Sequence, residues 1–251
     1  MTVALPARAK LNLDLRVTGR RPDGLHELRT HMQAIDLHDL LEAEPASETE
    51  LVMSGLPVAN DKPNTVLAAH AAVELVVGRR LPTRFRLHKR IPPGSGLGGA
   101  SSDAVAALRA LIALHRIGVD IASIAARVGS DASFFLCGGG ALVESVGEKL
   151  TRVPVQQAWY VIAWPGIELS TAQVYRAWDE VGGDGPNELR RAAARVDPRI
   201  DAFASSLGKG WQMTGSGSAF FSACPDRKRA EAMAKKLDCW TAVAQAEPSW
   251  A

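Results

Sequence analysis

The sequence is poor in cysteine and has no long apolar run. Its 251 residues include three cysteines. Because an odd number cannot all pair and their spacing is not that of metal ligands, we interpret Cys137, Cys224 and Cys239 as reduced structural residues. No stretch approaches the about 18 apolar residues that span a membrane, and residues 1–10 lack the apolar core of a signal peptide. We therefore expect a cytoplasmic protein with no membrane partner.

Charge of one sign is never concentrated. The chain has 29 Lys and Arg against 27 Asp and Glu, a formal net charge of +2, and no block of like charges occurs. Small clusters such as Arg20-Arg21 and Arg190-Arg191 are usually solvated arginines, so we expect no nucleic-acid partner. The hydrophobic fraction of 47% is typical of a globular protein with a sizeable core.

Strand and helix patterns are mixed along the chain without an internal repeat. Apolar patterns predict strands over residues 9–17, 31–40, 85–91, 141–143, 159–164 and 219–223. Helical spacing predicts helices over residues 66–77, directly behind 101–103, and over 121–128, 172–181, 188–196 and 226–237. This mixture indicates an α+β fold. Because the organisation restarts near residue 152, we expect an N-terminal domain over 1–150 and a C-terminal domain over 151–251.

The most informative segment is a glycine-rich loop over residues 92–103, Pro-Pro-Gly-Ser-Gly-Leu-Gly-Gly-Ala-Ser-Ser-Asp. Its glycines remove side-chain bulk, which lets successive backbone N–H groups turn inward and bind an anion. The predicted helix behind the loop adds the positive end of its dipole, so polyphosphate is the natural ligand. We expect Ser101 and Ser102 to cap this helix, and one of their hydroxyls can also reach a phosphate or Mg²⁺.

Two other glycine-rich motifs fit this loop less well. Gly94, Gly96 and Gly99 loosely match the dinucleotide pattern G-x-G-x-x-G. However, the preceding strand alternates instead of being continuously apolar, and Asp120 follows a helix with no strand to carry it to a ribose. The loop is not a Walker A motif, because Ala100 stands where that motif has lysine. A flexible linker would need neither the serines nor the apolar helix.

The loop resembles the second motif of the GHMP kinase superfamily, P-x-x-x-G-L-G-x-S-S. Three further stretches are similar to one family within it, the 4-diphosphocytidyl-2-C-methyl-D-erythritol kinases. They are A-K-L-N-L at 9–13 followed by G-R-R-P-D-G-L-H at 19–26, G-S-D-A-S-F-F at 129–135, and M-T-G-S-G-S at 213–218, which resembles the third GHMP motif. The resemblance implies an N-terminal domain like ribosomal protein S5 domain 2, a ferredoxin-like C-terminal domain, and an active site between them. It also implies transfer of the ATP γ-phosphoryl group to a hydroxyl of the methylerythritol part of the substrate, in the non-mevalonate route to isoprenoids.

The resemblance assigns catalytic and nucleotide-binding roles. Asp131 is expected to be the base that accepts the alcohol proton, and Lys10 to hold it ionised; without the resemblance these are a turn aspartate and an exposed strand lysine. Asn64 is expected near the adenosine, although it could simply cap a helix. ATP is further expected to contact Pro92, Pro93, Gly94, Ser95, Gly96, Leu97, Gly98, Gly99, Ala100, Ser101 and Ser102, with Ser101 and Ser102 also as Mg²⁺ ligands.

The expected substrate contacts lie in four separate stretches. They are Asn12, His26, Thr171, Tyr175, Gly215, Ser216 and Gly217. By resemblance His26 hydrogen-bonds the cytosine and Tyr175 stacks on it; the alternatives are a turn histidine and a core tyrosine, and for Asn12 a strand-edge amide. Leu25 departs from the family, which has a stacking tyrosine there, and stacking on an aromatic is worth about 1 to 3 kcal/mol per base.

Two alternative functions stay open. Another GHMP kinase, for a sugar, homoserine or a mevalonate derivative, would share both glycine loops but would not need residues 23–26. A catalytically inactive ligand sensor on the same fold would bind ATP without turnover, although the presence of both Lys10 and Asp131 favours activity. In every case we expect a small-molecule ligand and a monomer or homodimer.

Overall fold

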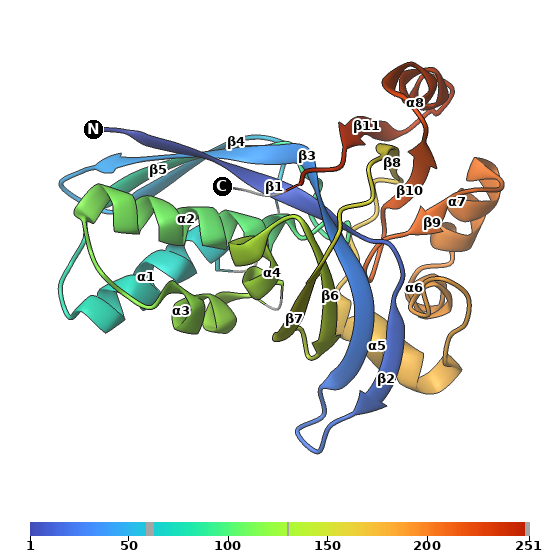
Figure 1. The fold of residues 1–251 in the computed structure, drawn as a ribbon, viewed down its shortest axis with the longest axis horizontal. Coiled ribbons are helices and arrows are strands. Elements are labelled where there is room, and N and C mark those ends of the chain that lie inside the picture. Colours follow the sequence, from blue (N-terminus) through green and yellow to red (C-terminus); the bar gives the residue numbers. More distant parts are fainter. Residues whose placement is uncertain (59–62, 130, 249–251) are drawn as a thin grey trace. The chain divides into compact units, whose positions relative to one another are not determined.

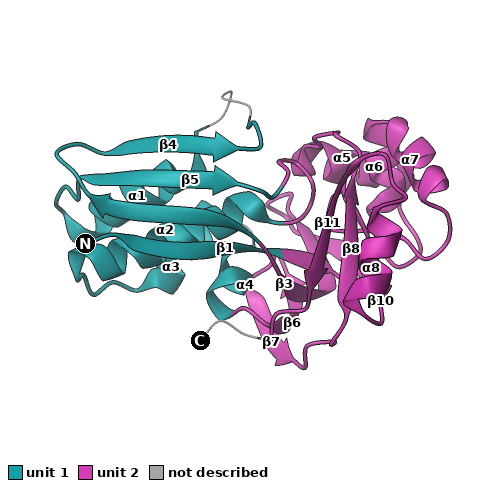
Figure 2. Cartoon of the chain, turned by 90° about the horizontal axis from the view of Figure 1, so that it is seen from above, with its two compact units in different colours: residues 1–9, 38–91, 98–137 teal, residues 10–37, 92–97, 138–251 magenta. Residues whose placement is uncertain are grey.

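The computed structural model describes residues 1–58, 63–129 and 131–248. The chain divides into two compact units, each assembled from segments that are distant in sequence (Figure 2). Unit 1 contains residues 1–9, 38–91 and 98–137, and unit 2 contains residues 10–37, 92–97 and 138–251. Strands β1 (Val3–Asn12) and β3 (His26–Pro45) each contribute residues to both units. Within the described ranges, no helix has the length and apolar character needed to cross a bilayer.

Unit 1 is a sheet with helices packed on one face (Figure 1). The C-terminal part of β3 pairs antiparallel with β5 (Thr83–Lys89), which pairs parallel with β4 (Glu50–Gly55). The helices are α1 (Thr65–Val77), α2 (Gly99–His115), α3 (Ile121–Val128) and α4 (Ala132–Cys137). Along β5, Phe85, Leu87 and Lys89 are buried while Arg86 and His88 are exposed, which confirms the predicted strand with one wet face.

Unit 2 contains two antiparallel strand arrangements. The N-terminal part of β3 pairs with β2 (Arg16–Arg20) and β6 (Gly140–Ser145), and β6 pairs with β7 (Lys149–Val153). A separate sheet has the order β11 (Trp240–Gln245), β8 (Trp159–Trp164), β10 (Phe220–Cys224) and β9 (Gln212–Met213). The helices are α5 (Thr171–Val181), α6 (Arg190–Val196), α7 (Arg199–Leu207) and α8 (Arg227–Ala234).

Helix ends with clear local signals lie where the sequence predicts them. The Asn64 side chain accepts a hydrogen bond from the N–H of Val66 at 2.9 Å and so caps α1. Gly78 ends this helix with a φ of 70°, a left-handed conformation that favours glycine. Helix α3 and strand β8 coincide with the predicted ranges 121–128 and 159–164.

Two predictions about local structure are wrong. The strand predicted over 9–17 is two strands, because β1 ends at Asn12 and β2 begins at Arg16. Between them the Asp14 carboxylate accepts the N–H of His31 at 2.7 Å, and both strands pair with β3. Helix α2 begins at Gly99, and its N-cap is Gly98, so Ser101 and Ser102 lie inside the first turn and do not cap it.

Residue 151 lies inside β7 in unit 2. The division into domains over 1–150 and 151–251 stays a prediction.

Candidate functional site

The glycine-rich loop is anchored through its carbonyl groups. The carbonyl oxygens of four successive residues, 94–97, all accept hydrogen bonds from unit 2. Gly94 O accepts the N–H groups of Leu169 and Ser218 at 3.1 and 3.2 Å, and Ser95 O accepts the N–H of Ala219 at 2.9 Å. Lys10 holds the other two carbonyls: its ammonium donates to Gly96 O at 2.7 Å, and its backbone N–H donates to Leu97 O at 3.0 Å. All four carbonyl oxygens of this segment are therefore occupied by hydrogen bonds that hold the loop in place.

The opposite side of the same peptide groups carries the N–H donors. A trans peptide is planar, with its N–H pointing away from its C=O, so the N–H groups of residues 95–98 face away from the anchoring donors. Within the described chain, none of these four N–H groups donates a hydrogen bond to a protein atom. Gly94, Gly96 and Gly98 have φ values of 57°, 78° and 78°, the alternating left-handed conformation of an anion-binding nest.

Helix α2, in unit 1, begins with N–H groups that no side chain caps. Its N-cap residue, Gly98, makes no side-chain capping bond, and the first intrahelical bond runs from Ser102 N–H to Gly98 O at 3.0 Å. The N–H groups of the first turn are therefore not occupied by a side chain, and they lie at the positive end of a 17-residue helix. N–H groups at a helix start of this kind suit phosphate oxygens; the binding of a polyphosphate here stays a prediction.

Lys10 is the buried cation beside the loop. Its side chain is buried, at 3% relative exposure, and its ammonium donates to Gly96 O and, at 2.5 Å, to the Asn12 side-chain oxygen. Asn12 is oriented in turn because its amide nitrogen donates to Thr30 Oγ1 at 2.8 Å, while its backbone N–H donates to Thr214 Oγ1 at 2.9 Å. Lys10 is therefore not the exposed strand lysine that composition alone favours. The contact of Asn12 with substrate stays a prediction.

The second glycine loop, residues 213–218, lies against the first. A Cβ on Gly215 would lie 2.9 Å from Gly96 O and 3.0 Å from the Lys10 ammonium nitrogen. Its neighbour Ser216 shares a hydrogen bond of 3.0 Å with Thr171, the first residue of α5. Gly217 packs within unit 2 against the Met213 sulfur, which a Cβ would approach to 2.8 Å. Unit 2 thus brings together Lys10, Asn12 and the predicted contacts Thr171 and 215–217.

Asp131 and Asn64 both belong to unit 1. Asp131 directly precedes α4 and accepts the N–H of Phe135 at 3.2 Å through its carbonyl oxygen. Gly129, two residues earlier, packs on Ser101, because a Cβ there would lie 2.5 Å from Ser101 Oγ. Asp131 therefore follows, by two residues, the point where the chain packs on the first turn of α2.

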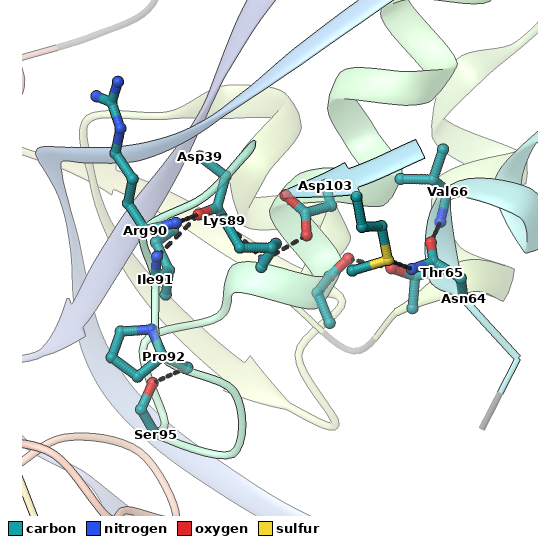
Figure 3. A network of polar contacts seen from close by, with 12 residues as sticks. Asp39, Asn64, Thr65, Val66, Lys89, Arg90, Ile91, Pro92, Ser95 and Asp103 are labelled. Carbon is teal, nitrogen blue, oxygen red and sulfur yellow. Dashed lines mark hydrogen bonds and ion pairs between the residues drawn. The ribbon is translucent and has the colours of Figure 1, made fainter. Parts of the chain in front are cut away.

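Asn64 caps α1, and its neighbour Thr65 donates to Ala100 O at 2.8 Å (Figure 3). Ser130 lies outside the described residues.

His26 is the centre of an aromatic cluster in unit 2. Its Nε2 lies 2.7 Å from Asp179 Oδ1, its ring stacks on Tyr175 with centroids 4.9 Å apart, and Trp178 meets it edge-on at 5.7 Å. Leu25 is 53% exposed and contributes no ring. Asp179 and Trp178 carry no motif, and sequence reasoning missed both of them, although Trp178 follows Tyr175 by three positions on one helix face.

A buried ion cluster lies in unit 1. The ammonium of Lys89 contacts Asp39 and, at 2.6 Å, Asp103 (Figure 3). Burial raises the pKa of Asp103 to about 8, although the ammonium opposes this shift. Burial also tends to lower the pKa of Lys89, but attraction to Asp103 and Asp39 outweighs it and raises that pKa above its ordinary value. Lys89 therefore stays charged, and sequence reasoning assigned no role to this cluster.

The donor atoms fit a nucleotide with a divalent cation. The uncapped N–H groups suit phosphate oxygens, and the hydroxyls of Ser101 and Ser102 are oxygen ligands of the kind Mg²⁺ takes. Among the residues that the structure describes, no group of three or more His, Cys, Asp and Glu could hold a metal ion.

Comparison with known proteins shows the family of the chain. The profile of the GHMP kinases N terminal domain matches residues 64–139. The chain is 41% identical over 206 residues to the 4-diphosphocytidyl-2-C-methyl-D-erythritol kinase of Symbiobacterium thermophilum, covering 80% of this chain and 73% of the relative. It is 34% identical over 263 residues to the enzyme of that name from Methylococcus capsulatus, covering 96% of this chain and 90% of the relative.

Solved structures show the same relationship. A crystal structure of 4-(cytidine 5'-diphospho)-2C-methyl-D-erythritol kinase superposes with a TM-score of 0.82 at 33% identity, covering 97% of this chain and 99% of that one. A homoserine kinase from Cytophaga hutchinsonii has a TM-score of 0.66 at 19% identity, over 99% of this chain and 95% of that one, which shows a shared fold alone. The predicted α+β GHMP kinase fold is thus confirmed. The chain belongs to the 4-diphosphocytidyl-2-C-methyl-D-erythritol kinase family of the GHMP kinases.

Proposed function

We propose that the protein transfers the γ-phosphoryl group of ATP to the 2-hydroxyl of 4-diphosphocytidyl-2-C-methyl-D-erythritol, in the non-mevalonate route to isoprenoid precursors. Family membership supports this substrate. The observation that carries the chemistry is the loop over residues 94–97, whose carbonyls are all anchored so that its N–H groups are presented as one set. A cytoplasmic location and a monomeric or homodimeric state are part of the same proposal.

The loop and the start of α2 hold the triphosphate in this proposal. Because the N–H groups are oriented before ATP arrives, little reorganisation is needed when charge develops on the transferred group. A hydroxyl of Ser101 or Ser102 would help to hold Mg²⁺, which would supply further charge neutralisation. Asn64 is proposed to lie near the adenosine, in addition to its role as the cap of α1.

Lys10 and Asp131 act on the alcohol. The substrate oxygen gives its proton to the Asp131 carboxylate and forms the new bond to the γ-phosphorus, while the bond from that phosphorus to the β–γ bridging oxygen breaks and ADP leaves. The Lys10 ammonium, fixed by Asn12 and Gly96, stabilises negative charge at the reacting oxygen. Lys10 lies in unit 2 and Asp131 in unit 1, and their cooperation is proposed on the basis of the family.

The His26 cluster is proposed to recognise the cytosine. In the tautomer whose Nε2–H donates a hydrogen bond to Asp179, Nδ1 of His26 is an acceptor. Cytosine presents an amino group as a donor at N4, so the two groups are complementary. Tyr175 and Trp178, which both contact the His26 ring, are the aromatic side chains available to stack where Leu25 provides none.

A substrate panel tests this proposal. Purified protein, ATP and Mg²⁺ are incubated with cytidylated methylerythritol, galactose, homoserine or mevalonate, and ADP release and the phosphorylated product are measured. We expect kcat/KM to be larger for the first substrate by a factor of about 10² or more, because a site that pairs buried polar groups discriminates strongly. Equal rates on all four alcohols would remove the substrate assignment. ATP binding with no ADP from any alcohol would favour the sensor alternative.

A further inference from the structure

Lys89 is an unusual residue on the buried face of β5. Its strand neighbours on that face, Phe85 and Leu87, are core residues, and Lys89 itself is only 6% exposed. A buried charge is costly and, even when paired, seldom adds net stability compared with apolar side chains. The partners of Lys89 indicate a role other than stability.

Asp39 links the ammonium to the chain segment that enters the nucleotide loop. One carboxylate oxygen contacts the Lys89 ammonium, and the other accepts the backbone N–H groups of Arg90 and Ile91 at 2.5 and 2.8 Å. These two residues immediately precede Pro92, where the loop begins. Asp39 is fully buried. A carboxylate in the core therefore sets the direction of the chain as it leaves β5.

Asp103 links the same ammonium to the helix that leaves the loop. Its Oδ2 lies 2.6 Å from the Lys89 nitrogen, whereas Oδ1 is buried with no hydrogen-bond partner in the described chain. The first helical residue, Gly99, lies on the end of the strand, since a Cβ there would be 3.0 Å from Ile91 Cγ2 and 3.4 Å from the Lys89 nitrogen. One ammonium thus holds both flanks of the loop (Figure 3).

We propose that Lys89, with Asp39 and Asp103, is a positioning residue for ATP: the ammonium sets the distance between the end of β5 and the first turn of α2. This distance fixes the curvature of the loop between them, and hence the convergence of its N–H groups on the phosphates. The inference rests on the proposed function, because it assigns these residues to the nucleotide site of that reaction. None of the three is proposed to touch ATP.

The test separates nucleotide affinity from stability. Lys89→Met removes the ammonium at similar length, and Lys89→Met/Asp103→Leu also removes the carboxylate that would otherwise be left buried without its partner. Val73→Ala, a cavity variant in the core of α1 (Val73 is 0% exposed), is the control for lost stability. Each is measured for the melting temperature, for the Kd of a non-hydrolysable ATP analogue with Mg²⁺ by calorimetry, and for the KM of each substrate.

We expect Lys89→Met to raise the Kd of the ATP analogue by about tenfold or more, because a misplacement of about 1 Å is already costly for a bound group. The KM of the alcohol is expected to change by less than about twofold, since it reports a different set of contacts. The double variant should recover thermal stability and keep the raised Kd. Val73→Ala should lose stability and keep the wild-type Kd.

Three results would overturn the inference in distinguishable ways. Wild-type Kd in either folded variant that lacks the ammonium would show that the cluster does not position the loop, while leaving the proposed function intact. A wild-type protein that binds no ATP analogue would instead overturn the proposed function and this inference with it. A Kd raised equally in Val73→Ala would show that lost stability alone explains the effect.

Discussion

The contact between the two glycine loops makes Gly96 a sharp test of the site. Gly96 has a φ of 78°, and a Cβ on it would lie 2.2 Å from Thr214 O and 3.0 Å from both the N and O atoms of Gly217. These are backbone atoms of a loop that is itself tied to residues 94 and 95, so they cannot move aside as a flexible side chain would. Gly96→Ala therefore tests whether the close approach of the loops matters for nucleotide use.

The expected magnitude follows from two separate costs. The left-handed backbone costs an alanine about 1 to 2 kcal/mol, which for a chain of this size lowers the melting temperature by about 2 to 8 °C. A relaxed carbon–oxygen contact is about 3.3 Å, so the loops must separate by roughly 1 Å to accept the methyl group. A displacement of about 1 Å near the chemistry can cost about 10²-fold in rate, equivalent to about 2.7 kcal/mol.

Gly166→Ala is the matched control. Gly166 has a φ of 74°, and a Cβ there would meet nothing within 4 Å, so this variant carries the backbone cost without the clash. Steady-state kinetics with ATP varied, together with thermal melts of both variants, separate the two costs. We expect kcat/KM for ATP to fall by about 10²-fold in Gly96→Ala and to stay near wild type in Gly166→Ala. A folded Gly96→Ala protein as active as Gly166→Ala would refute the view that this loop seats the nucleotide.

Four further outcomes are expected. Asp131→Asn should lower kcat by about 10² to 10⁴, the range for a lost general base, with ATP affinity kept by calorimetry; near-normal kcat would exclude Asp131 as the base. Asp179→Asn should raise the KM of the cytidylated substrate while the KM of ATP stays unchanged, because it frees His26; an equal rise in both would contradict that role. Thr30→Val leaves the Asn12 amide nitrogen buried without its acceptor, which should cost about 1 to 3 kcal/mol in denaturant melts; unchanged stability would show that the bond is replaced. Burial raises the pKa of the Cys224 thiol, so less of it is thiolate at pH 8, and mass spectrometry should show slower alkylation by iodoacetamide than in the urea-unfolded chain; equal rates would contradict its burial.

Elements with a complete local signal could be predicted from the sequence. Helix α1 has a capping residue at its start, apolar residues at helical spacing and a glycine at its end, and each feature acts through neighbours within a few positions. The same is true of α3, where Asp120 caps the helix through the Ala122 N–H at 3.1 Å. The ends of these two helices are set by residues close in sequence, and contacts with distant residues do not shift them.

The start of α2 could not be predicted in this way. Ser101 and Ser102 are strong capping residues by type, and a local argument places the helix start at them. The helix instead begins at Gly99, after a loop whose carbonyls are fixed by Lys10, Leu169, Ser218 and Ala219, all more than 70 positions away. Tertiary hydrogen bonds thus outweigh a local capping preference, and the result is a helix end open to an anion.

Leucine at position 25 shows that a motif and the fold can differ in where an aromatic ring lies. In the linear motif, leucine at that position removes the stacking ring, and on sequence alone the cytosine site is deficient. In the fold, helix α5 places Tyr175 and Trp178 against the same His26 ring, because positions three apart share a helix face. Aromatic surface beside the histidine is therefore supplied from a segment about 150 residues along the chain, as the pairing of His26 with Asp179 also shows. No motif records this arrangement, since the motif specifies only the residue at position 25, whereas the rings beside His26 come from helix α5.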